Sequence, residues 1–376
     1  MELSGATLRN AEAPNQASSQ ALLQVRNLIV RIFPDAARSD PTHGDASHAI
    51  RPLKGVTFQI HRGETVGLLG ESGAGKTTLA NALMRLLPSS SRVVEGSIEF
   101  EGRPFLSLDE QELRKMRGAR ISLIYQDSAV LNPVLRVGEH LVEVLRAHYS
   151  WPRRHYREKA IALLEDMELP DTDRIYAAYP HQLSGGQRQR IVIAQALACR
   201  PALVIADEPT ASLDPVTSSE IIELLARLKR GFQTAFLLIS HDLTPLARLA
   251  DRIMVMYAGR IIEQGSRDEI LDQASHPYTR ALLACVLPQD VTNGTGDADV
   301  NEDVEQPTDE QRIGKQPAGK RPIPTIAGSP PDLMQPVPGC AFESRCPERM
   351  AICGTRFPAE IRQSPTHTVR CFKYGG

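Results

Sequence analysis

The segment GESGAGKT, residues 70–77, limits the possible folds of this chain more than any other feature. It matches the pattern G-x-x-x-x-G-K-[ST], with Gly70, Gly75, Lys76 and Thr77 at the fixed positions. An apolar run, TVGLL, precedes the segment, and a helical pattern, TLANALMRLL, follows it. A strand that turns through glycines into a helix directs consecutive backbone N–H groups at phosphate oxygens. The segment therefore predicts an α/β fold that contains a nucleotide-binding phosphate loop.

Each residue of this loop has an expected role. Lys76 is expected to reach the β- and γ-phosphates, and Thr77 is expected to ligate Mg²⁺. The alternative, a glycine-rich turn that carries a lysine by chance, does not explain why a strand and a helix flank the segment. The other positions expected to line the nucleotide are Glu71, Ser72, Gly73, Ala74 and Thr78.

Length and composition describe an ordinary globular chain of about two domains. It has 376 residues, of which 41% are hydrophobic and 23% charged, and domains average roughly 150 residues. Lys plus Arg number 43 against 45 Asp plus Glu, so the net charge of -2 gives no overall field that attracts nucleic acid or anionic lipid. The apolar runs fall short of the roughly 18 residues that a membrane-spanning helix needs. The first residues lack the order of a secretory signal, so we expect a cytosolic chain whose six cysteines are thiols or metal ligands.

The chain divides into segments of different composition. We expect a loose polar lead over residues 1–21 and an α/β domain over 22–287, where short apolar runs alternate with helical patterns as in a mostly parallel sheet. Within that domain, residues 127–182 lack a strand pattern and predict a helical insertion. Residues 288–321 are acidic and polar and predict a solvated linker. The last segment, 322–376, is rich in Pro and Cys and has little material for a core.

Two carboxylates end the apolar run LVIADE at residues 203–208. Nucleotide hydrolysis needs one carboxylate near Mg²⁺ and one near the attacking water. We therefore expect Asp207 to ligate the metal and Glu208 to act as the general base. A strand that ends in acidic residues is common, because Asp also caps helices, so this assignment depends on the phosphate loop. His241 likewise follows an apolar run, and taken alone such a histidine is more often structural.

The segment LSGGQRQRIVIAQALA, which starts at Leu183, predicts a second phosphate-binding helix start. Ser184 can cap the helix while Gly185 and Gly186 leave its first N–H groups open to an anion. A simple capped helix is the alternative for Ser-Gly-Gly alone. A chain that already has one phosphate loop needs a second anion site only if the nucleotide is also held from another side.

With these motifs in this order, residues 22–287 resemble the ATP-binding subunit of an ABC transporter. The resemblance implies a P-loop NTPase fold, with a RecA-like core and a helical subdomain, in which ATP is sandwiched between two cassettes. It implies that Gln126 senses nucleotide and Mg²⁺, that His241 contacts the γ-phosphate and that Asp214 lies at the dimer interface. It also implies that one cassette completes its partner's nucleotide site through Ser184, Gly185, Gly186 and Gln187.

One position departs from the pattern of that family. Family members usually place an aromatic residue near the end of the first strand, where it stacks on adenine. Ile32 stands at that position in this chain, and Phe33 is the candidate substitute. Phe33 is therefore counted among the expected nucleotide-binding residues.

Three further segments resemble the ATPase subunits of dipeptide, oligopeptide and nickel importers: YQDSAVLNPVLRVGEHL, AYPHQLSGGQRQR and HPYTRALL. The resemblance implies import of peptides or a related small solute through two separate membrane permease subunits. Its further partners would be an extracytoplasmic solute-binding protein and a second ATP-binding subunit, in a homodimer or a heterodimer. The helical insertion after Gln126 would dock on the permeases. The chain would then be a peripheral protein on the cytoplasmic face of the inner membrane, with no nucleic-acid partner.

Two other functions remain open from the residues alone. A soluble ABC ATPase that acts on nucleic acid or in translation usually has two cassettes or a long coiled-coil insertion, and this sequence shows neither. An exporter cassette is disfavoured by the importer-like C-terminal segment.

The last segment carries four cysteines spaced C-x5-C-x6-C-x17-C, namely Cys340, Cys346, Cys353 and Cys371. Four thiols are the full ligand set of one [4Fe–4S] cluster or one tetrahedral Zn²⁺. The sequence lacks a C-x-x-C pair in this segment, which disfavours a zinc ribbon, and Cys-Pro occurs at iron–sulfur sites. We expect the cluster first, zinc second and free thiols third, with His367 as a ligand if only three cysteines bind. Cys199 and Cys285 lie in helical patterns and predict small buried side chains.

Overall fold

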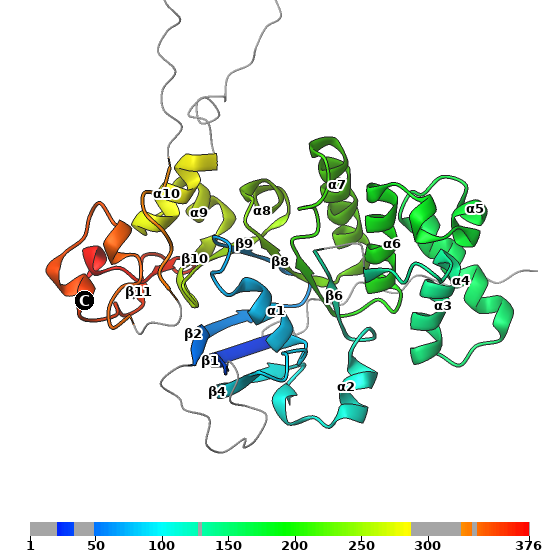
Figure 1. The fold of residues 1–376 in the computed structure, drawn as a ribbon, viewed down its shortest axis with the longest axis horizontal. Helices are drawn as coiled ribbons and strands as arrows, with labels where there is room; N and C mark the ends of the chain where they lie inside the picture. Colours follow the sequence, from blue (N-terminus) through cyan, green and yellow to red (C-terminus); the bar gives the residue numbers. More distant parts are fainter. Residues whose placement is uncertain (1–20, 34–48, 127–129, 287–324, 333–336, 376) are drawn as a thin grey trace, which may run out of the picture. The chain divides into compact units, whose positions relative to one another are not determined.

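The structure is a computed structural model that describes residues 21–33, 49–126, 130–286, 325–332 and 337–375 (Figure 1). It divides into two compact units, Met1–Ile261 and Ile262–Gly376. The expected lead over residues 1–21, apart from Ala21, and the expected linker over 288–321 lie outside the described residues. Among the described residues, no helix is both long and apolar enough to cross a membrane.

The first unit contains a parallel sheet with its strands in the order β9-β3-β8-β7-β6. Every residue of β3, β7 and β8 is buried. Strands that are covered on both faces consist of continuous apolar runs, which confirms the mostly parallel α/β core expected from the sequence. The bounds of the strands are β3 Thr65–Leu69, β6 Ile121–Ile124, β7 Leu203–Asp207, β8 Ala235–Ser240 and β9 Arg252–Tyr257.

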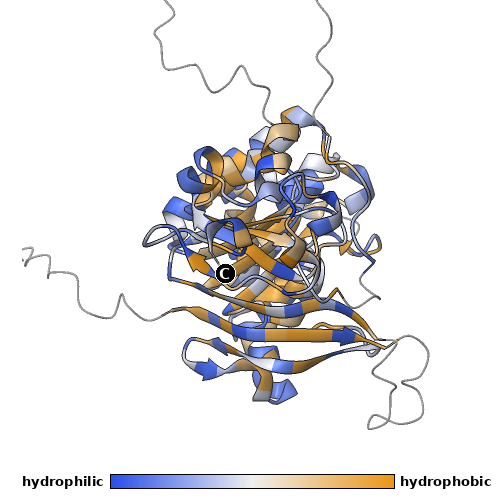
Figure 2. Ribbon diagram, turned by 90° about the vertical axis from the view of Figure 1, so that its left-hand side faces the viewer, coloured by the Kyte–Doolittle hydropathy of each residue, from blue (hydrophilic) through white to orange (hydrophobic). Residues whose placement is uncertain are grey.

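A second, antiparallel sheet of the same unit has the order β2-β1-β4-β5. Strand β1 pairs with β2 on one side and β4 on the other, which places Leu23 opposite Ile60 and Phe100. Hydrophobic and hydrophilic residues follow one another along these strands (Figure 2), as expected for a sheet with one buried face. The bounds are β1 Leu23–Ile32, β2 Ile50–Ile60, β4 Ser91–Phe100 and β5 Arg103–Pro104.

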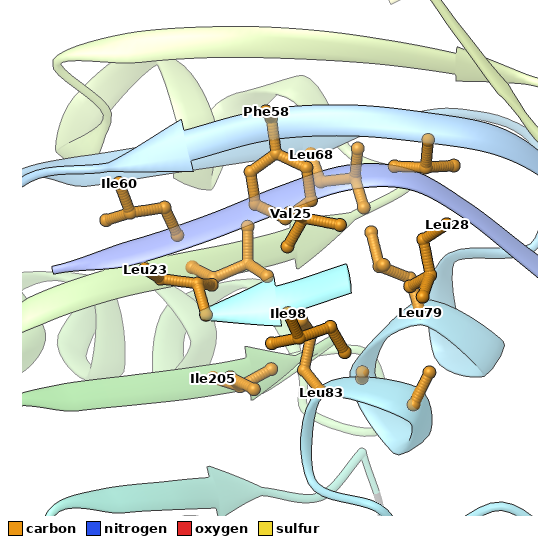
Figure 3. Packing of buried hydrophobic residues seen from close by; sticks show 14 of the residues in the cluster. Leu23, Val25, Leu28, Phe58, Ile60, Leu68, Leu79, Leu83, Ile98 and Ile205 are labelled. Carbon is orange, nitrogen blue, oxygen red and sulfur yellow. The ribbon is translucent and has the colours of Figure 1, made fainter. Parts of the chain in front are cut away.

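The apolar core of the first unit lies between these two sheets and helix α1 (Lys76–Leu83). Figure 3 shows Val25 and Ile98 from the antiparallel sheet packing with Leu79 of α1 and Ile205 of β7. All four side chains are almost fully buried. The helix that follows the phosphate loop is therefore held by core packing against both sheets, and this fixes the position of the loop itself.

Helices that pack on the strands of the parallel sheet or on one another complete the first unit. Helix α6 (Gly185–Leu197) packs on β6, and α8 (Leu243–Leu249) packs on β3 and β8. The described part of the expected insertion contains α3, α4 and α5, which pack on one another and contain no strand. The remaining bounds are α2 Glu110–Met116, α3 Val137–His148, α4 Arg153–Asp166, α5 Thr172–Ala177, α7 Pro215–Phe232, and short 3-10 helices at Phe105–Ser107 and Pro180–Gln182.

The second unit is built on a small antiparallel sheet. Strand β12 pairs with β10 through Val369 and Glu263, and β11 pairs with the other edge of β12. The rings of Tyr278 and Phe342 meet edge to face at 5.4 Å and are almost fully buried. Its elements are β10 Arg260–Ser266, α9 Arg267–Asp272, α10 Pro277–Val286, β11 Ile361–Arg362, β12 Thr368–Val369, and 3-10 helices at Glu343–Arg345, Ala351–Gly354 and Phe372–Tyr374.

Truncation of Leu68 on β3 tests the packing of the first core. Leu68 is fully buried, so Leu68→Ala is expected to remove about 2–5 kcal/mol of stability by leaving a cavity. Leu86→Ala is the matched control, because Leu86 is 39% exposed and its truncation is expected to change stability by less than about 0.5 kcal/mol. Urea unfolding followed by circular dichroism measures both. Equal midpoints for the two variants would contradict this account of the core.

Candidate nucleotide site

The phosphate loop connects the end of β3 at Leu69 to the start of α1 at Lys76. Gly75 has a φ of 105° and a side chain there would clash with the carbonyl oxygen of Pro52, so only glycine fits. No side chain caps the start of α1. Its first N–H groups are therefore left to a ligand, and a helix start of this kind attracts anions.

Lys76 is the buried cation of this loop. Its Nζ donates to the carbonyl oxygens of Gly70 at 2.8 Å and Glu71 at 3.1 Å, and it lies 3.7 Å from Oε1 of Glu208. Burial lowers the pKa of the Lys76 ammonium, while the Glu208 and Asp207 carboxylates oppose that shift. The positive charge is thus aimed into the loop, where phosphate oxygens can replace the carbonyls as acceptors.

Asp207 ends β7 and has the donor set of a magnesium ligand. The Thr77 hydroxyl lies close enough to lower the pKa of its carboxyl, and the carboxylate oxygen Oδ1 is buried with no hydrogen-bond partner among the described residues. Burial raises the pKa of the Asp207 carboxyl, which the Thr77 hydroxyl and Lys76 counteract. Mg²⁺ prefers carboxylate and hydroxyl oxygens. The orphaned oxygen beside Thr77 therefore fits this metal.

Three predicted residues converge on the carboxylate of Glu208. Oε1 lies 3.0 Å from Nδ1 of His241 and 3.7 Å from Nζ of Lys76, and Oε2 accepts from Nε2 of Gln126 at 3.1 Å. Glu208 follows β7, His241 follows β8 and Gln126 follows β6. Because these strands are parallel, their carboxyl ends meet at one edge of the sheet, where α/β proteins bind ligands. The structure thus gathers the residues expected to carry out hydrolysis.

The helix starts at Ser184 and Asp214 form a separate group. Ser184 caps α6 by accepting from the backbone N–H of Gln187, whose side chain returns the contact to the N–H of Ser184. Asp214 caps α7, and the hydroxyl and N–H of Thr217 help to lower the pKa of the Asp214 carboxyl. Among the described residues, no hydrogen bond or ion pair joins this group to the Glu208 carboxylate.

Thr217 is a residue that the sequence reasoning missed. A side chain at Gly186 would clash with the Thr217 methyl group, so the starts of α6 and α7 approach closely at this point. No motif carries this signal, since Thr217 is a simple helix residue two positions after a proline.

Phe33 is buried at the end of the described part of the first strand. It is 7% exposed, and the guanidinium of Arg92 lies over its ring at 4.3 Å from the centroid. One face of the ring is therefore already covered. Ile32 beside it is half-buried. The structure offers no open aromatic face at Phe33, so adenine stacking there stays a prediction.

The four cysteines of the second unit line one enclosed cavity, together with His276 and the rings of Phe342 and Phe372. We call this the cysteine cavity, and its ligand candidates are Cys340, Cys346, Cys353 and Cys371. Burial raises the pKa of Cys340 to about 11 and also raises the pKa of the Cys346 and Cys371 thiols. In the part of the chain that the structure describes, no three His, Cys, Asp or Glu side chains are close enough to hold an ion. The expected metal centre is thus not shown, although its four proposed ligands are gathered.

The histidine proposed as a substitute ligand does not line this cavity. Nε2 of His367 lies 2.8 Å from Oε1 of Glu263, and both side chains are buried. The structure therefore gathers the four cysteines without His367, and the alternative ligand set of three cysteines and His367 stays a prediction. Of the other two cysteines, Cys199 is buried as expected, whereas Cys285 is half-buried on α10.

Comparisons with known proteins agree with this geometry. Residues 53–211 match the family model "ABC transporter", and residues 262–315 and 312–353 match "Oligopeptide/dipeptide transporter, C-terminal region". The dipeptide transport ATP-binding protein DppD of Bacillus subtilis (strain 168) is 39% identical, with 94% of this chain and 95% of that protein covered. The oligopeptide transport ATP-binding protein OppD of Escherichia coli (strain K12) is also 39% identical, with 95% of each chain covered.

Solved structures show the same fold. The dimeric structure of MJ0796, a bacterial ABC transporter cassette, has a TM-score of 0.56 and 29% identity, covering 65% of this chain and 98% of that one. This confirms the P-loop NTPase cassette expected from the motifs. The chain therefore belongs to the ABC transporter family of ATP-hydrolysing subunits and, through its C-terminal region, to the oligopeptide/dipeptide branch of that family.

Proposed function

We propose that this chain hydrolyses ATP to power the import of peptides through two separate membrane permease subunits. The observation that supports it most is the convergence of Lys76, Gln126 and His241 on the Glu208 carboxylate, next to the unpaired oxygen of Asp207. The relatives that cover almost the whole chain are named dipeptide and oligopeptide transport ATP-binding proteins.

Each residue of the site has a role in this proposal. Glu208 takes a proton from the water that attacks the γ-phosphoryl group, so that the bond to the β-phosphate breaks and ADP and phosphate leave. His241 and Gln126, which already contact Glu208, hold the carboxylate and the water in line. Lys76 donates to the β- and γ-phosphate oxygens and balances their charge.

The remaining phosphate-loop residues bind the triphosphate through backbone N–H groups and side chains at the start of α1. These residues are Gly70, Glu71, Ser72, Gly73, Ala74, Gly75 and Thr78. The oxygens of Thr77, Gln126 and Asp207 would hold Mg²⁺, which supplies positive charge at the phosphates when it is bound. The free Oδ1 of Asp207 supports this ligand set.

A second cassette would complete each nucleotide site. In this proposal Ser184, Gly185, Gly186 and Gln187 contact the nucleotide of the partner, and Asp214 lies at the interface. Val216 beside Asp214 is 71% exposed, and an apolar side chain left in water next to a helix start supports an interface there. The cassette of MJ0796 to which this fold is similar was solved as a dimer.

The surface that docks on the permeases would lie after Gln126. Val130 and Val134 follow it and are 49% and 74% exposed. Apolar side chains that stay in water shortly after Gln126 in the chain support a protein contact there, which would link hydrolysis to the permeases. We place the chain as a peripheral protein at the cytoplasmic face of the inner membrane, supplied with peptide by an extracytoplasmic solute-binding protein.

The cysteine cavity would hold a [4Fe–4S] cluster, with Zn²⁺ as the alternative occupant. All four cysteines line one enclosed space, and burial, together with repulsion between the sulfur charges, raises the pKa of the Cys340, Cys346 and Cys371 thiols. Thiolate ligands at such a place need a cationic centre to balance them. A cluster supplies that charge and accepts four cysteines.

The first test of this proposal replaces the general base. Glu208→Gln keeps the side-chain size but replaces the carboxylate by an amide, which cannot take a proton. ATP should therefore still bind, while hydrolysis falls by about two to four orders of magnitude. Binding is measured with labelled ATP and turnover by phosphate release. Glu223→Gln makes the same chemical change at an exposed position of α7 and should keep normal turnover. Undiminished turnover of Glu208→Gln would end the assignment.

The second test asks whether the site is shared between two chains. A Lys76→Ala chain mixed with a Ser184→Ala chain forms mixed dimers with one site intact and one doubly altered. Partial recovery of ATP hydrolysis over either variant alone is expected, measured after dimer formation has been verified by light scattering. If verified mixed dimers recover nothing, Ser184 does not act on the nucleotide of a partner.

The third test concerns the cysteine cavity. Protein prepared without oxygen should contain iron and acid-labile sulfide in equal amounts, about four of each per chain. Cys346→Ser should lose most of this iron and keep ATP hydrolysis, whereas Cys285→Ser, outside the cavity on α10, should keep both. Metal analysis and sulfide assay provide the readout. Zinc without sulfide would replace the cluster by the alternative, and four freely titratable thiols without metal would reject both.

A further inference from the structure

Two aromatic rings stack on each other just before the start of α6, and the proposed mechanism uses neither of them. The rings of Tyr179 and His181 are almost parallel, with an angle of 10° between their planes and centroids 5.6 Å apart. The guanidinium of Arg136 lies over the Tyr179 ring, 5.3 Å from its centroid. Tyr179 is half-buried, whereas His181 is exposed and has no second ring stacked on it among the described residues. One face of the His181 ring is therefore taken by Tyr179, and the other is open to solvent.

Local hydrogen bonds hold this ring pair close to Ser184. The backbone N–H of Gln182 donates to the carbonyl oxygen of Tyr179 at 3.0 Å, and the side-chain oxygen of Gln182 accepts from the N–H of Tyr179 at 2.8 Å. The N–H of Leu183 donates to the carbonyl oxygen of Pro180 at 3.3 Å. These bonds close a short 3-10 helix that ends two positions before Ser184, the cap of α6. The position of the rings is thus tied to the start of α6.

The adenine of ATP lacks an open aromatic partner on the first strand. Phe33 is only 7% exposed, and the guanidinium of Arg92 lies over its ring. Adenine is a flat aromatic ring, and proteins commonly hold bases by stacking them on aromatic side chains. In the proposed dimer, Ser184 contacts the ATP of the partner, so an open ring face beside Ser184 is available to the base of that ATP.

We infer that the open face of His181 stacks on the adenine of the ATP that is bound in the phosphate loop of the partner. The inference rests on the proposed function, because it needs an ATP that two chains share. Tyr179 packs behind the His181 ring and fixes its plane, and the guanidinium of Arg136 packs on Tyr179. The stack selects a triphosphate that carries a base over one that carries none, and it tolerates every base because every base has a π-face.

A purely structural role of the ring pair makes a different prediction. If the rings only stabilise the turn before α6, then His181→Ala leaves the KM for ATP unchanged. If His181 stacks on adenine, His181→Ala raises this KM by about tenfold. The kcat stays the same, because the stack is equally present in the ground state and the transition state. His181→Phe keeps an aromatic face and should keep the low KM.

The experiment uses full-length mixed dimers that contain one intact site. That site takes its phosphate loop from a Ser184→Ala chain and its α6 start from a Lys76→Ala chain. His181→Ala is added to the Lys76→Ala chain in one sample and to the Ser184→Ala chain in the other, which is the matched control. We expect the KM for ATP to rise about tenfold in the first sample only. His181→Phe on the Lys76→Ala chain should leave the KM at the value of the parent mixed dimer.

A second measurement separates base stacking from a disturbed Ser184. Inorganic tripolyphosphate offers phosphates without a base, so its inhibition constant against ATP hydrolysis should be the same with and without His181→Ala. An inhibition constant that rises as much as the KM for ATP overturns the inference, because the loss would then lie at the phosphates.

The same samples distinguish failure of this inference from failure of the proposed function. If the parent mixed dimers recover no hydrolysis, the shared site fails, and the stacking of His181 on a partner's ATP fails with it. If they recover hydrolysis and His181→Ala leaves the KM for ATP unchanged in both samples, only the inference is overturned. An equal rise of the KM in both samples also overturns it, because His181 would then not act across the dimer.

Discussion

The parallel pairing of β3, β6, β7 and β8 is the constraint on which the rest of the nucleotide site depends. Ile205 on β7 pairs with Leu123 and Leu237, and Leu238 on β8 pairs with Gly67. This register brings the ends of four strands to one edge, and Lys76, Gln126, Glu208 and His241 each follow one of those ends. A change of register by one residue turns every side chain to the opposite face of the sheet. The short distances around Glu208 therefore depend first on the strand pairing of the sheet and second on the conformation of the loops.

Opposing charges hold the Glu208 site together. Lys76 is buried and loses hydration, which favours its neutral form, while the adjacent carboxylates favour its charged form. Glu208 itself has a φ of 49°, a left-handed conformation that costs a residue with a side chain about 1 kcal/mol or more. Its N–H donates to the carbonyl oxygen of Ile239 at 2.9 Å. The backbone is thus held in an unfavourable conformation that aims the carboxylate at the loop.

The sequence predicted those parts of the site that local patterns determine. The loop from Gly70 to Thr77 is a local motif, because glycines and the following helix are set by neighbours in the chain. The role of His241 was not assigned from its own segment, since its partner Glu208 is 33 positions away and is reached only through the pairing of β7 with β8. The contact of Thr217 with Gly186 was missed for the same reason. The pairing of His367 with Glu263 is a tertiary contact that spacing alone cannot show.

Glu263 explains how the small second unit orders its polar residues. Among the described residues no Lys or Arg forms an ion pair with this buried carboxylate, yet it accepts from the N–H groups of Ser275 and His276 and contacts Nε2 of His367. Burying a carboxylate is costly unless hydrogen bonds replace its water, so these three contacts must form together. These contacts join β10, the start of α10 and the residue before β12 at the Glu263 carboxylate. Because His276 also borders the cysteine cavity, the order of that cavity depends on the same carboxylate that fixes the pairing of β12 with β10.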